Sequence, residues 1–358
     1  MADAPTTLIL GAGVMGTALT FPLADAGGDV TLVGTHLDDK WIEAIRRSRV
    51  HPKLGMRVPA GITALHHSEL PAALARKPGL VVLGVSSPGV PWAVSRLSEH
   101  LQTPTPLLLL TKGLAARDKR IVPLTEIVAT GLARAREWRV GDVIAGGVGG
   151  PCIAAELAAR RETHVVIGVV PSLATTCRAR FHASYYHVRY TTDIAGVELS
   201  AALKNFFAIG VGTAAGLLKR EGLAANGATA HNPAAALFAQ AVSEIAYLVS
   251  ALGGRAETAI GQAGTGDLYV TCQAGRNMRL GALLGTGIRI GEARKQMAGE
   301  TVEGADLALE IGPVLRNMMR EGSLEQWRLP LTRAILEAVV DGSAWQEPDP
   351  ESLAHMEE

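Results

Sequence analysis

The first half of the chain alternates short apolar runs with segments of helical periodicity. Near-continuous apolar runs of this kind are typical of strands in a parallel sheet that helices cover on both faces. The runs occupy residues 7–11, 29–34, 79–85, 106–111, 143–148, 164–170 and 185–190. We therefore predict an α/β fold with a doubly wound parallel sheet, which should bind ligands at the carboxyl ends of its strands.

From about residue 190 onward the apolar positions follow a helical period. Helices are predicted over 194–218, 233–252, 304–322 and 331–342. Residues 217–232, LLKREGLAANGATAHN, have turn composition and predict a surface loop. The pattern thus predicts an α/β domain over 1–190, an all-α domain over 191–346 and a loosely held acidic tail over 347–358.

The composition adds a few limits. A chain of 358 residues is too long for one ordinary core, which also favours two domains. Lysine plus arginine and aspartate plus glutamate each number 34, so the chain lacks the net positive charge expected of a nucleic-acid binder. We find no basic leader ahead of an apolar core and no stretch apolar enough to span a bilayer, and we expect a cytoplasmic protein.

Cysteines and histidines do not predict a metal site. The three cysteines share no pairing or ligand spacing, so we expect reduced thiols. They are Cys152, Cys177 and Cys272. Four histidines also fall outside any metal-like spacing and are interpreted as surface residues. These are His36, His51, His66 and His67.

Three glycines follow the first predicted strand and precede a predicted helix. Gly11, Gly13 and Gly16 give the pattern G-x-G-x-x-G. In a dinucleotide-binding turn the first glycine permits the tight turn, the second lets the backbone approach a pyrophosphate, and the third lets helix and strand pack closely. The phosphates then lie at the positive end of the helix. We therefore predict a Rossmann-type domain that binds NAD or NADP.

The end of the second strand leaves the choice of cofactor open. An acid at this place binds a free ribose, whereas small or basic residues accommodate a 2′-phosphate. The strand ends Val33-Gly34-Thr35-His36, and two aspartates follow slightly late, at Asp38 and Asp39. Because Gly34 and Thr35 would not repel a phosphate, the sequence leans towards NADP.

Lys204 is a candidate for proton transfer. It and Glu198 are the charged residues of the apolar stretch from Ile194 to Leu218. Burying a lone ammonium is costly and tends to lower its pKa, which suits proton exchange with a hydroxyl or a carbonyl. The alternative is an ammonium that reaches solvent or pairs with Glu198.

Two further groups have candidate chemistry. Lys112 follows the apolar run LLLLT, where a ligand is expected, although it also fits an exposed turn. Arg276 and Asn277 follow Gly275, and such a group suits phosphate oxygens. Asp267 precedes them. In the alternative interpretation, Asp267 caps a helix and Arg276 lies in solvent.

These motifs, in this order, resemble the NAD(P)-dependent glycerol-3-phosphate dehydrogenases of the soluble bacterial type. The similarity runs from about residue 7 to residue 342 and is carried most specifically by GVELSAALKN and AGTGDLYVTC. The resemblance implies reversible hydride transfer between NAD(P)H and dihydroxyacetone phosphate, giving sn-glycerol 3-phosphate, a precursor of glycerophospholipids. It also suggests a homodimer.

The resemblance implies a role for each matching residue. Lys204 would exchange the proton of the C2 hydroxyl, Lys112 would stabilise the developing oxyanion and touch both ligands, and Asp267 would orient Lys204. The substrate-contacting residues it implies are Lys112, Gly150, Cys152, Lys204, Asp267, Gly275, Arg276 and Asn277. The cofactor-contacting residues are Gly11, Gly13, Val14, Met15, Gly16, Thr35, Lys112, Ala154, Arg276, Thr301 and Glu303.

The chain departs from the family pattern at three positions. Gly149 and Gly275 stand where the family usually has serine, and Ala234 stands where it has a basic residue. A missing hydroxyl removes a charge-assisted hydrogen bond of about 1.5 to 3 kcal/mol. A dehydrogenase of the same fold for another phosphorylated or carboxylated alcohol is therefore an alternative. A catalytically silent, NAD(P)-sensing protein is a further one.

Overall fold

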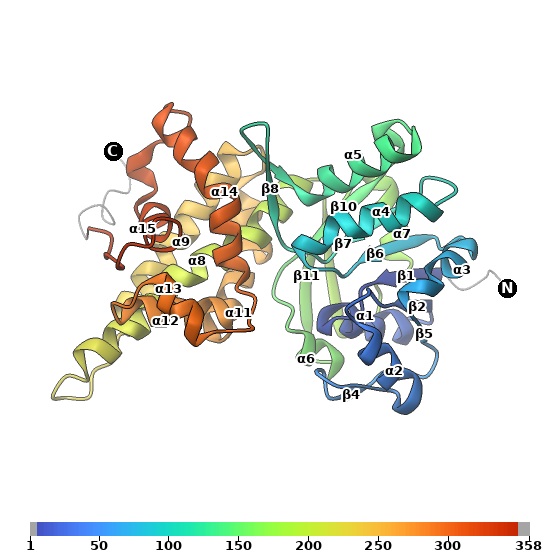
Figure 1. Cartoon of the computed structure of the whole chain (residues 1–358), viewed down its shortest axis with the longest axis horizontal. Coiled ribbons are helices and arrows are strands. Elements are labelled where there is room, and N and C mark those ends of the chain that lie inside the picture. The colour runs from blue at the N-terminus through green and yellow to red at the C-terminus, as the bar shows by residue number, and fades with distance from the viewer. Residues whose placement is uncertain (1–5, 350–358) are drawn as a thin grey trace. The chain divides into compact units, whose positions relative to one another are not determined.

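The computed structural model of the chain describes residues 6–349 and divides into two compact units (Figure 1). Unit 1 contains the residues up to Lys112 together with Pro123–Glu198. Unit 2 contains Gly113–Val122 together with the residues from Leu199 onward. Neither unit is one continuous stretch of chain, whereas we expected contiguous domains over 1–190 and 191–346. Most of the predicted acidic tail, 350–358, lies outside the described residues.

An eight-stranded sheet forms the centre of unit 1, in the order β12-β11-β10-β7-β6-β1-β2-β5. Six neighbouring strands of this sheet, from β10 to β5, run parallel, which confirms the predicted α/β fold. The strands are β1 Thr6–Leu10, β2 Asp29–Val33, β5 Thr63–Leu65, β6 Leu80–Leu83, β7 Leu107–Leu109, β10 Ala145–Gly149, β11 Thr163–Gly168 and β12 Tyr186–Thr191.

The last two strands depart from the expected parallel arrangement. β11 pairs with β10 in the antiparallel sense, and β12 is parallel to β11. The chain turns back after β10 at Gly150, whose φ of +107° is a conformation that favours glycine. An apolar run does not record strand direction, so the sequence pattern could not distinguish the two arrangements. β5 was not predicted at all, because this three-residue strand has no apolar run.

Helices cover both faces of the sheet (Figure 1). On one face, alternate strand residues such as Ile9 and Val82 form a buried core with side chains of α1, α2, α6 and α7. On the other face, α4 and α5 pack against each other. The helices of unit 1 that precede α8 are α1 Val14–Asp25, α2 Asp39–Ser48, α3 Leu70–Ala75, α4 Val90–His100, α5 Leu124–Arg136, α6 Ala154–Ala158 and α7 Pro171–Arg178. A small antiparallel pair, β3 Val50–His51 and β4 Met56–Arg57, follows α2.

Unit 2 is helical, as the apolar period predicted. Its long helices are α8 Ile194–Glu221, which enters the unit at Leu199, α9 His231–Ala251, α14 Glu303–Arg320 and α15 Pro330–Val339. Shorter helices lie between α9 and α14, and the sequence pattern did not identify them. They are α10 Ala256–Ile260, α11 Asp267–Gln273, α12 Arg276–Gly285 and α13 Ile290–Gln296.

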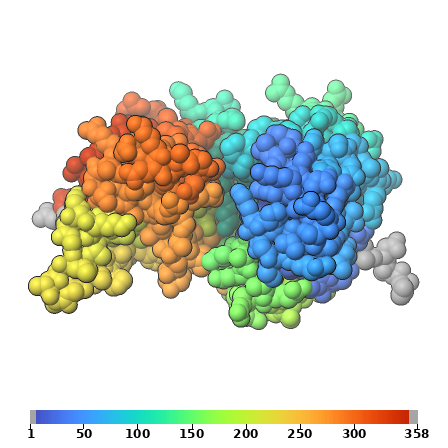
Figure 2. Space-filling view, turned by 60° about the horizontal axis from the view of Figure 1, so that its bottom comes forward, coloured from blue at the N-terminus to red at the C-terminus, as the bar shows by residue number. Residues whose placement is uncertain are grey.

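The predicted loop at 217–232 is shorter than expected. α8 continues through Glu221, so the connection to α9 covers residues 222–230. Leu217 is buried, and a Cβ added to Gly216 would lie 2.2 Å from the carbonyl oxygen of Ala282, so close packing extends the helix past the predicted end. The end of α8, the connection and the start of α9 form the yellow projection of Figure 2.

A hairpin inserted after β7 belongs to unit 2. It consists of β8 Leu114–Arg117 and β9 Arg120–Pro123, joined by Asp118 and Lys119 with φ of +48° and +60°. Two such residues are typical of the tight turn that matches strand twist. The backbone N–H of Ala116 donates to Glu310 of α14 at 2.9 Å, which fixes β8 against that helix.

A buried carboxylate joins α9 to the start of α15. Glu244 accepts hydrogen bonds from the backbone N–H groups of Leu331 and Thr332, both at 2.7 Å, and from the Thr332 hydroxyl. It thereby satisfies N–H groups in the first turn of α15, which have no partner within the helix. Burial raises the pKa of Glu244 to about 7, although these hydrogen bonds oppose the shift.

Two helices, α8 and α9, are long and apolar enough to cross a bilayer by length and composition. We expected no stretch apolar enough to span a bilayer, and these two helices pass a test of length and composition that buried core helices also pass. In α8, however, 83% of the most apolar window is buried inside the protein. Its small residues pack against α12, since Cβ atoms added to Gly281 and Gly285 would lie 2.0 and 2.2 Å from α8 carbonyl oxygens. Core packing in unit 2 accounts for the composition of α8; the corresponding window of α9 is 39% buried.

Candidate functional site

The glycine-rich turn between β1 and α1 has three different glycine environments. Gly11 has a φ of +115°, and a Cβ there would lie 2.7 Å from the backbone of Gly84. A Cβ on Gly16 would lie 2.2 Å from the carbonyl oxygen of Gly11. Gly13 caps α1 and has no atom within 4 Å of an added Cβ. Two glycines thus serve packing, while Gly13 leaves open space at the N-terminus of a 12-residue helix.

Two buried polar residues hold Ala12 within this turn. The backbone N–H of Ala12 donates to Asp38 Oδ2 at 3.0 Å. Its carbonyl oxygen is 3.0 Å from His51 Nε2. Leu54 N–H donates to His51 Nδ1, so Nε2 carries the proton and donates to Ala12. Burial lowers the pKa of His51, which favours this neutral ring.

The prediction that His51 lies at the surface is therefore wrong, since its side chain is fully buried. The physical reason is that two backbone groups satisfy both ring nitrogens, which removes most of the cost of burial. Neither contact leaves a sequence pattern, because His51 and Ala12 are 39 positions apart. The contact of Asp38 with Ala12 was likewise not predicted, because the sequence showed Asp38 only as an acid that follows the end of β2 by a few residues.

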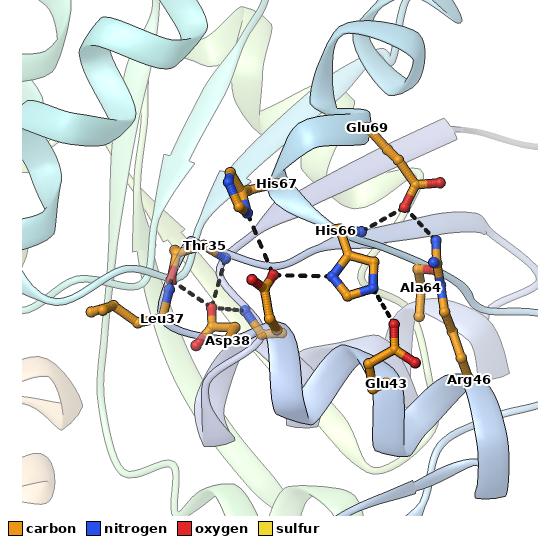
Figure 3. A network of polar contacts seen from close by, with 11 residues as sticks. Thr35, Leu37, Asp38, Glu43, Arg46, Ala64, His66, His67 and Glu69 are labelled. Carbon is orange, nitrogen blue, oxygen red and sulfur yellow. Dashed lines mark hydrogen bonds and ion pairs between the residues drawn. The ribbon is translucent and has the colours of Figure 1, made fainter.

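One oxygen of the Asp38 carboxylate is engaged inside unit 1. Oδ2 also accepts the N–H of Thr35 at 2.8 Å and the Thr35 hydroxyl at 2.9 Å (Figure 3). Asp38 is 6% exposed, and it ties the end of β2 to the glycine-rich turn. It is therefore a support for this turn, and His36, which is exposed, follows Thr35 at the surface.

Beside Asp38, His66 contacts two carboxylates (Figure 3). Its Nδ1 lies 3.0 Å from Asp39 and its Nε2 2.6 Å from Glu43, so both nitrogens face acceptors. The contact with Asp39 raises the pKa of His66, and Glu43 acts in the same direction. His67 Nδ1 lies 3.4 Å from the same Asp39 oxygen. This cluster adjoins the end of β2 and positions α2 against the segment that follows β5.

Four other predicted residues of unit 1 follow strand ends at the sheet edge. Lys112 comes after β7 and is half-buried, and its carbonyl oxygen accepts a hydrogen bond from Ser87 at 3.2 Å. Gly150, Cys152 and Ala154 follow β10, and Ala154 opens α6. Cys177 and Cys272 are free thiols among the described residues. The structure thus brings these residues to strand ends, where ligands of open α/β sheets bind.

Unit 2 contains a buried ion pair between Lys204 of α8 and Asp267 of α11. Nζ of Lys204 contacts Asp267 Oδ1 and also donates to Thr271 Oγ1 at 2.8 Å. Lys204 is 7% exposed and Asp267 1%. Asp267 begins α11 directly after a π-helical turn at Gln262–Gly266, a feature that often marks functional sites. Thr271, which sequence reasoning missed, lies one turn after Asp267 and holds the ammonium in place.

Glu198 is not the partner of Lys204. Its carboxylate accepts the Thr125 N–H at 3.2 Å and contacts the Thr125 hydroxyl, at the first turn of α5 in unit 1. Burial raises the pKa of Glu198 to about 7. The alternative in which Lys204 reaches solvent or pairs with Glu198 is therefore wrong, because each charged group has its own buried partners.

The N-terminus of α12 presents Gly275, Arg276 and Asn277. Gly275 has a φ of +120° and nothing within 4 Å of an added Cβ. Arg276 forms an exposed ion pair with Glu303, the first residue of α14. The Asn277 side chain is buried, donating to Asn205 Oδ1 at 3.0 Å and accepting from Gly304 N–H at 2.9 Å. Asn277 therefore braces α8, α12 and α14, and its side chain is engaged within the fold.

Thr301 is exposed just before α14. It precedes Glu303, the ion-pair partner of Arg276, by two positions. Asn205, the neighbour of Lys204 on α8, was not predicted, and only its position next to the candidate lysine could have suggested it. Most of the predicted cofactor-contacting residues thus lie in unit 1, whereas Arg276, Thr301 and Glu303 lie in unit 2. Lys204, Asp267 and the start of α12 also lie in unit 2, and Lys112, Gly150 and Cys152 lie in unit 1.

Comparisons with known proteins identify the family of the chain. The N-terminal region characteristic of NAD-dependent glycerol-3-phosphate dehydrogenases matches residues 6–173, and the C-terminal region matches residues 193–347. An NADP(+)-dependent glycerol-3-phosphate dehydrogenase of Archaeoglobus fulgidus is 36% identical over 290 residues, 81% of this chain and 82% of that protein. A glycerol-3-phosphate dehydrogenase [NAD(P)+] of Geobacillus thermodenitrificans is 31% identical, covering 93% and 90% of the two chains. The crystal structure of a glycerol-3-phosphate dehydrogenase from Coxiella burnetii is similar with a TM-score of 0.76, at 26% identity and 98% coverage of both chains.

Proposed function

Since this chain belongs to the family of NAD-dependent glycerol-3-phosphate dehydrogenases, we propose that it catalyses reversible hydride transfer between NAD(P)H and dihydroxyacetone phosphate. As a family member it is an NAD(P)-dependent oxidoreductase acting on a CH–OH group. The product of the reductive direction is sn-glycerol 3-phosphate. The observation that supports this proposal most directly is the buried Lys204–Asp267 pair, because a buried, oriented ammonium is suited to proton exchange with an alcohol.

The residues of unit 1 fit a dinucleotide. Gly13 leaves space for the pyrophosphate, and the first N–H groups of α1, at Val14 and Met15, provide donors for it. When bound, the nicotinamide gives or takes the hydride. The further residues proposed to contact the cofactor, on the family resemblance, are Gly11, Gly16, Thr35, Lys112, Ala154, Arg276, Thr301 and Glu303.

Lys204 has the role of proton carrier in this proposal. In the reductive direction the Lys204 ammonium donates a proton to the C2 oxygen as the carbonyl carbon takes the hydride, and in the oxidative direction the neutral amine accepts the proton of the C2 hydroxyl as the carbonyl forms. Asp267 and Thr271 hold Nζ in one position and prevent it from turning away. On the family resemblance, Lys112 stabilises the charge that develops on the substrate oxygen. Gly150 and Cys152 are proposed as substrate contacts on the same basis.

Phosphate binding is proposed for the start of α12. Arg276 offers a guanidinium, and the backbone N–H groups of Gly275, Arg276 and Asn277 lie at the positive end of a 10-residue helix. Because the Asn277 side chain already has two partners, we assign its contribution to the backbone N–H. The φ of +120° at Gly275 also accounts for the missing family serine, since a side chain there would be strained.

NADP is the proposed cofactor of preference. The acid that would bind a free ribose is expected at the end of β2, whereas Asp38 follows Val33, the last residue of β2, by five positions, is 6% exposed, and accepts three hydrogen bonds from Thr35 and Ala12 at Oδ2. This leaves Thr35 and the exposed His36 at the strand end, neither of which repels a 2′-phosphate. Titrating the purified protein with NADP+ and NAD+, followed by tryptophan fluorescence, should give a dissociation constant at least about tenfold lower for NADP+. Tighter binding of NAD+ would contradict the preference.

An assay with purified protein tests the reaction. NADPH or NADH is mixed with dihydroxyacetone phosphate, and the absorbance of the reduced nicotinamide is followed. We expect oxidation with this ketone and none with unphosphorylated dihydroxyacetone. Turnover with a different phosphorylated or carboxylated substrate would favour the alternative that the glycines at 149 and 275 suggest. Cofactor binding without turnover on any hydroxy or keto compound would favour a sensor.

A cytoplasmic homodimer is proposed from the family resemblance. The relatives of the chain are named glycerol-3-phosphate dehydrogenases, and 83% of the most apolar window of α8 is buried inside the protein. Light scattering on the purified full chain gives its mass in solution, and fractionation of expressing cells gives its location. A monomer in light scattering would contradict the first part, and recovery in the membrane fraction the second.

A further inference from the structure

We infer that Glu162, His164 and His187 form a binding site for a divalent transition-metal ion, with Zn²⁺ as the ion that the ligand set favours. The three residues lie at the start of β11 and β12 in unit 1. One ligand atom from each lies within 4.8 Å of the others. The site is separate from the groups assigned above to cofactor, proton transfer and phosphate.

The sheet brings the two histidines together. His164 and His187 are register partners on the parallel strands β11 and β12, and their ring centroids are 4.5 Å apart at an interplanar angle of 23°. Register partners point to the same face of a sheet. Glu162 precedes His164 by two residues, so it shares this face, and its carboxylate contacts His187 Nε2. Three potential ligands are thereby fixed by backbone pairing.

The chemistry of the three groups is that of a zinc site. Neutral imidazole and carboxylate are common Zn²⁺ ligands, at about 2.0 to 2.2 Å from the metal. Tetrahedral ligands are then about 3.3 Å apart. All three side chains are exposed, so the two stacked imidazoles and the carboxylate can rotate to bring their ligand atoms to this spacing. Water would complete the coordination sphere, as in other sites with three protein ligands.

The backbone beneath the site is well supported. The carbonyl oxygen of His164 lies against the turn at Gly150, where an added Cβ would be 3.1 Å from it. β12 is the edge strand of the sheet, so a metal bound to both strands would link the edge to its neighbour. A ligand that binds only the folded state stabilises it. We therefore expect the metal to raise the thermal stability of the chain.

Calorimetric titration of the chelator-treated full chain with ZnCl₂ tests the site. We expect one Zn²⁺ per chain, a raised thermal midpoint, and no binding of Mg²⁺, which prefers oxygen ligands. His164→Ala and His187→Ala should each weaken Zn²⁺ binding at least about tenfold and abolish the thermal shift. Glu162→Gln should weaken binding less, because the two imidazoles remain.

His231→Ala is the matched control, since His231 is exposed at the start of α9, outside the cluster. It should bind Zn²⁺ as the unchanged chain does. Dehydrogenase turnover, measured for every variant, shows that each one is folded. Absence of Zn²⁺ binding to the unchanged chain overturns the proposal. Equal binding by His187→Ala and His164→Ala also overturns it, because the metal would then be held elsewhere, for example by thiols.

Discussion

Asp38 and His51 hold opposite sides of one residue, Ala12, in the glycine-rich turn. Asp38 accepts the N–H of Ala12 and His51 donates to its carbonyl oxygen, each at 3.0 Å. Ala12 directly precedes Gly13, the residue that leaves open space at the start of α1. The two side chains therefore set the orientation of the peptide groups proposed to face the pyrophosphate, although neither is assigned a contact with the cofactor.

Replacing Asp38 by alanine should weaken the binding of NAD+ and NADP+ to a similar extent. The change leaves buried N–H groups of Ala12 and Thr35 without a partner, at a cost of about 1 to 3 kcal/mol, and releases the turn. Fluorescence titrations with both cofactors measure the effect. Asp39→Ala, an exposed neighbouring change, serves as the control and should bind both cofactors normally. A loss of affinity for NAD+ alone would show instead that Asp38 binds the ribose directly.

A pair of glycine substitutions should separate cofactor binding from folding. An alanine Cβ at Gly13 enters open space in an allowed conformation, so Gly13→Ala should keep its melting temperature but bind cofactor at least about tenfold more weakly. At Gly16 the same Cβ would lie 2.2 Å from a backbone oxygen. That overlap, costing about 1 to 3 kcal/mol, outweighs the gain of up to about 1 kcal/mol from alanine in a helix. Gly16→Ala should therefore melt at a lower temperature. Normal cofactor binding by Gly13→Ala would contradict the proposed place of the pyrophosphate.

Lys204→Met should reduce turnover by about 10² to 10⁴-fold, the range expected when a proton carrier is lost. Cofactor affinity should be unchanged, because the cofactor-binding turn lies in unit 1. Lys219→Met, an exposed change on the last turn of α8, is the matched control and should remain active. Steady-state rates and fluorescence titrations of both variants provide the comparison. An active Lys204→Met enzyme would exclude the assigned role.

Asp267→Asn should be less stable as well as less active. It removes the carboxylate from the buried ion pair with Lys204, and breaking a buried pair in this way costs about 3 to 5 kcal/mol. A lowered urea midpoint together with lowered turnover is the expected result. Loss of turnover at full stability would mean that Asp267 contributes to the reaction alone and not to the fold.

The raised pKa of Glu244 predicts a specific pH dependence. Its pKa is about 7 in the folded chain against an ordinary value of 4.5, so the folded state binds its proton more tightly. This residue therefore favours folding most at low pH, and its contribution falls as pH rises from about 4.5 to about 7. As pH rises over this interval, the free energy of unfolding of Glu244→Gln should increase relative to that of the unchanged chain by about 2 to 3 kcal/mol. Urea denaturation of both proteins at several pH values measures this difference. Glu337→Gln, exposed on α15, should show no such trend.

The parts of the fold that the sequence predicted correctly are those that packing dictates locally. The apolar runs of β1, β2, β6 and β7 are buried on both faces, so their composition alone marks them. The direction of β11, the three residues of β5 and the hairpin at β8 depend on partners far along the chain. The local composition of these segments does not predict such distant partners.

The candidate site shows the same contrast. Gly11, Gly13, Gly16 and Lys204 stand out by pattern or by charge in an apolar stretch. His51 and Asp38 could not be found in this way, because their contacts with Ala12 join three separate segments. The metal ligands His164 and His187 escaped spacing arguments for the same reason, since sheet register and not chain distance brings them together.

The hairpin at Gly113–Val122 means that the chain passes between the two units three times, after Lys112, after Val122 and after Glu198. No single cut therefore yields two self-sufficient fragments. A fragment ending near residue 190 would carry β8 and β9 without α14, and the complementary fragment would lack the strands that α14 normally contacts. Gene fusions or exchanges that join the front half of one relative to the back half of another should respect this interleaving, by transferring the hairpin with the helical unit.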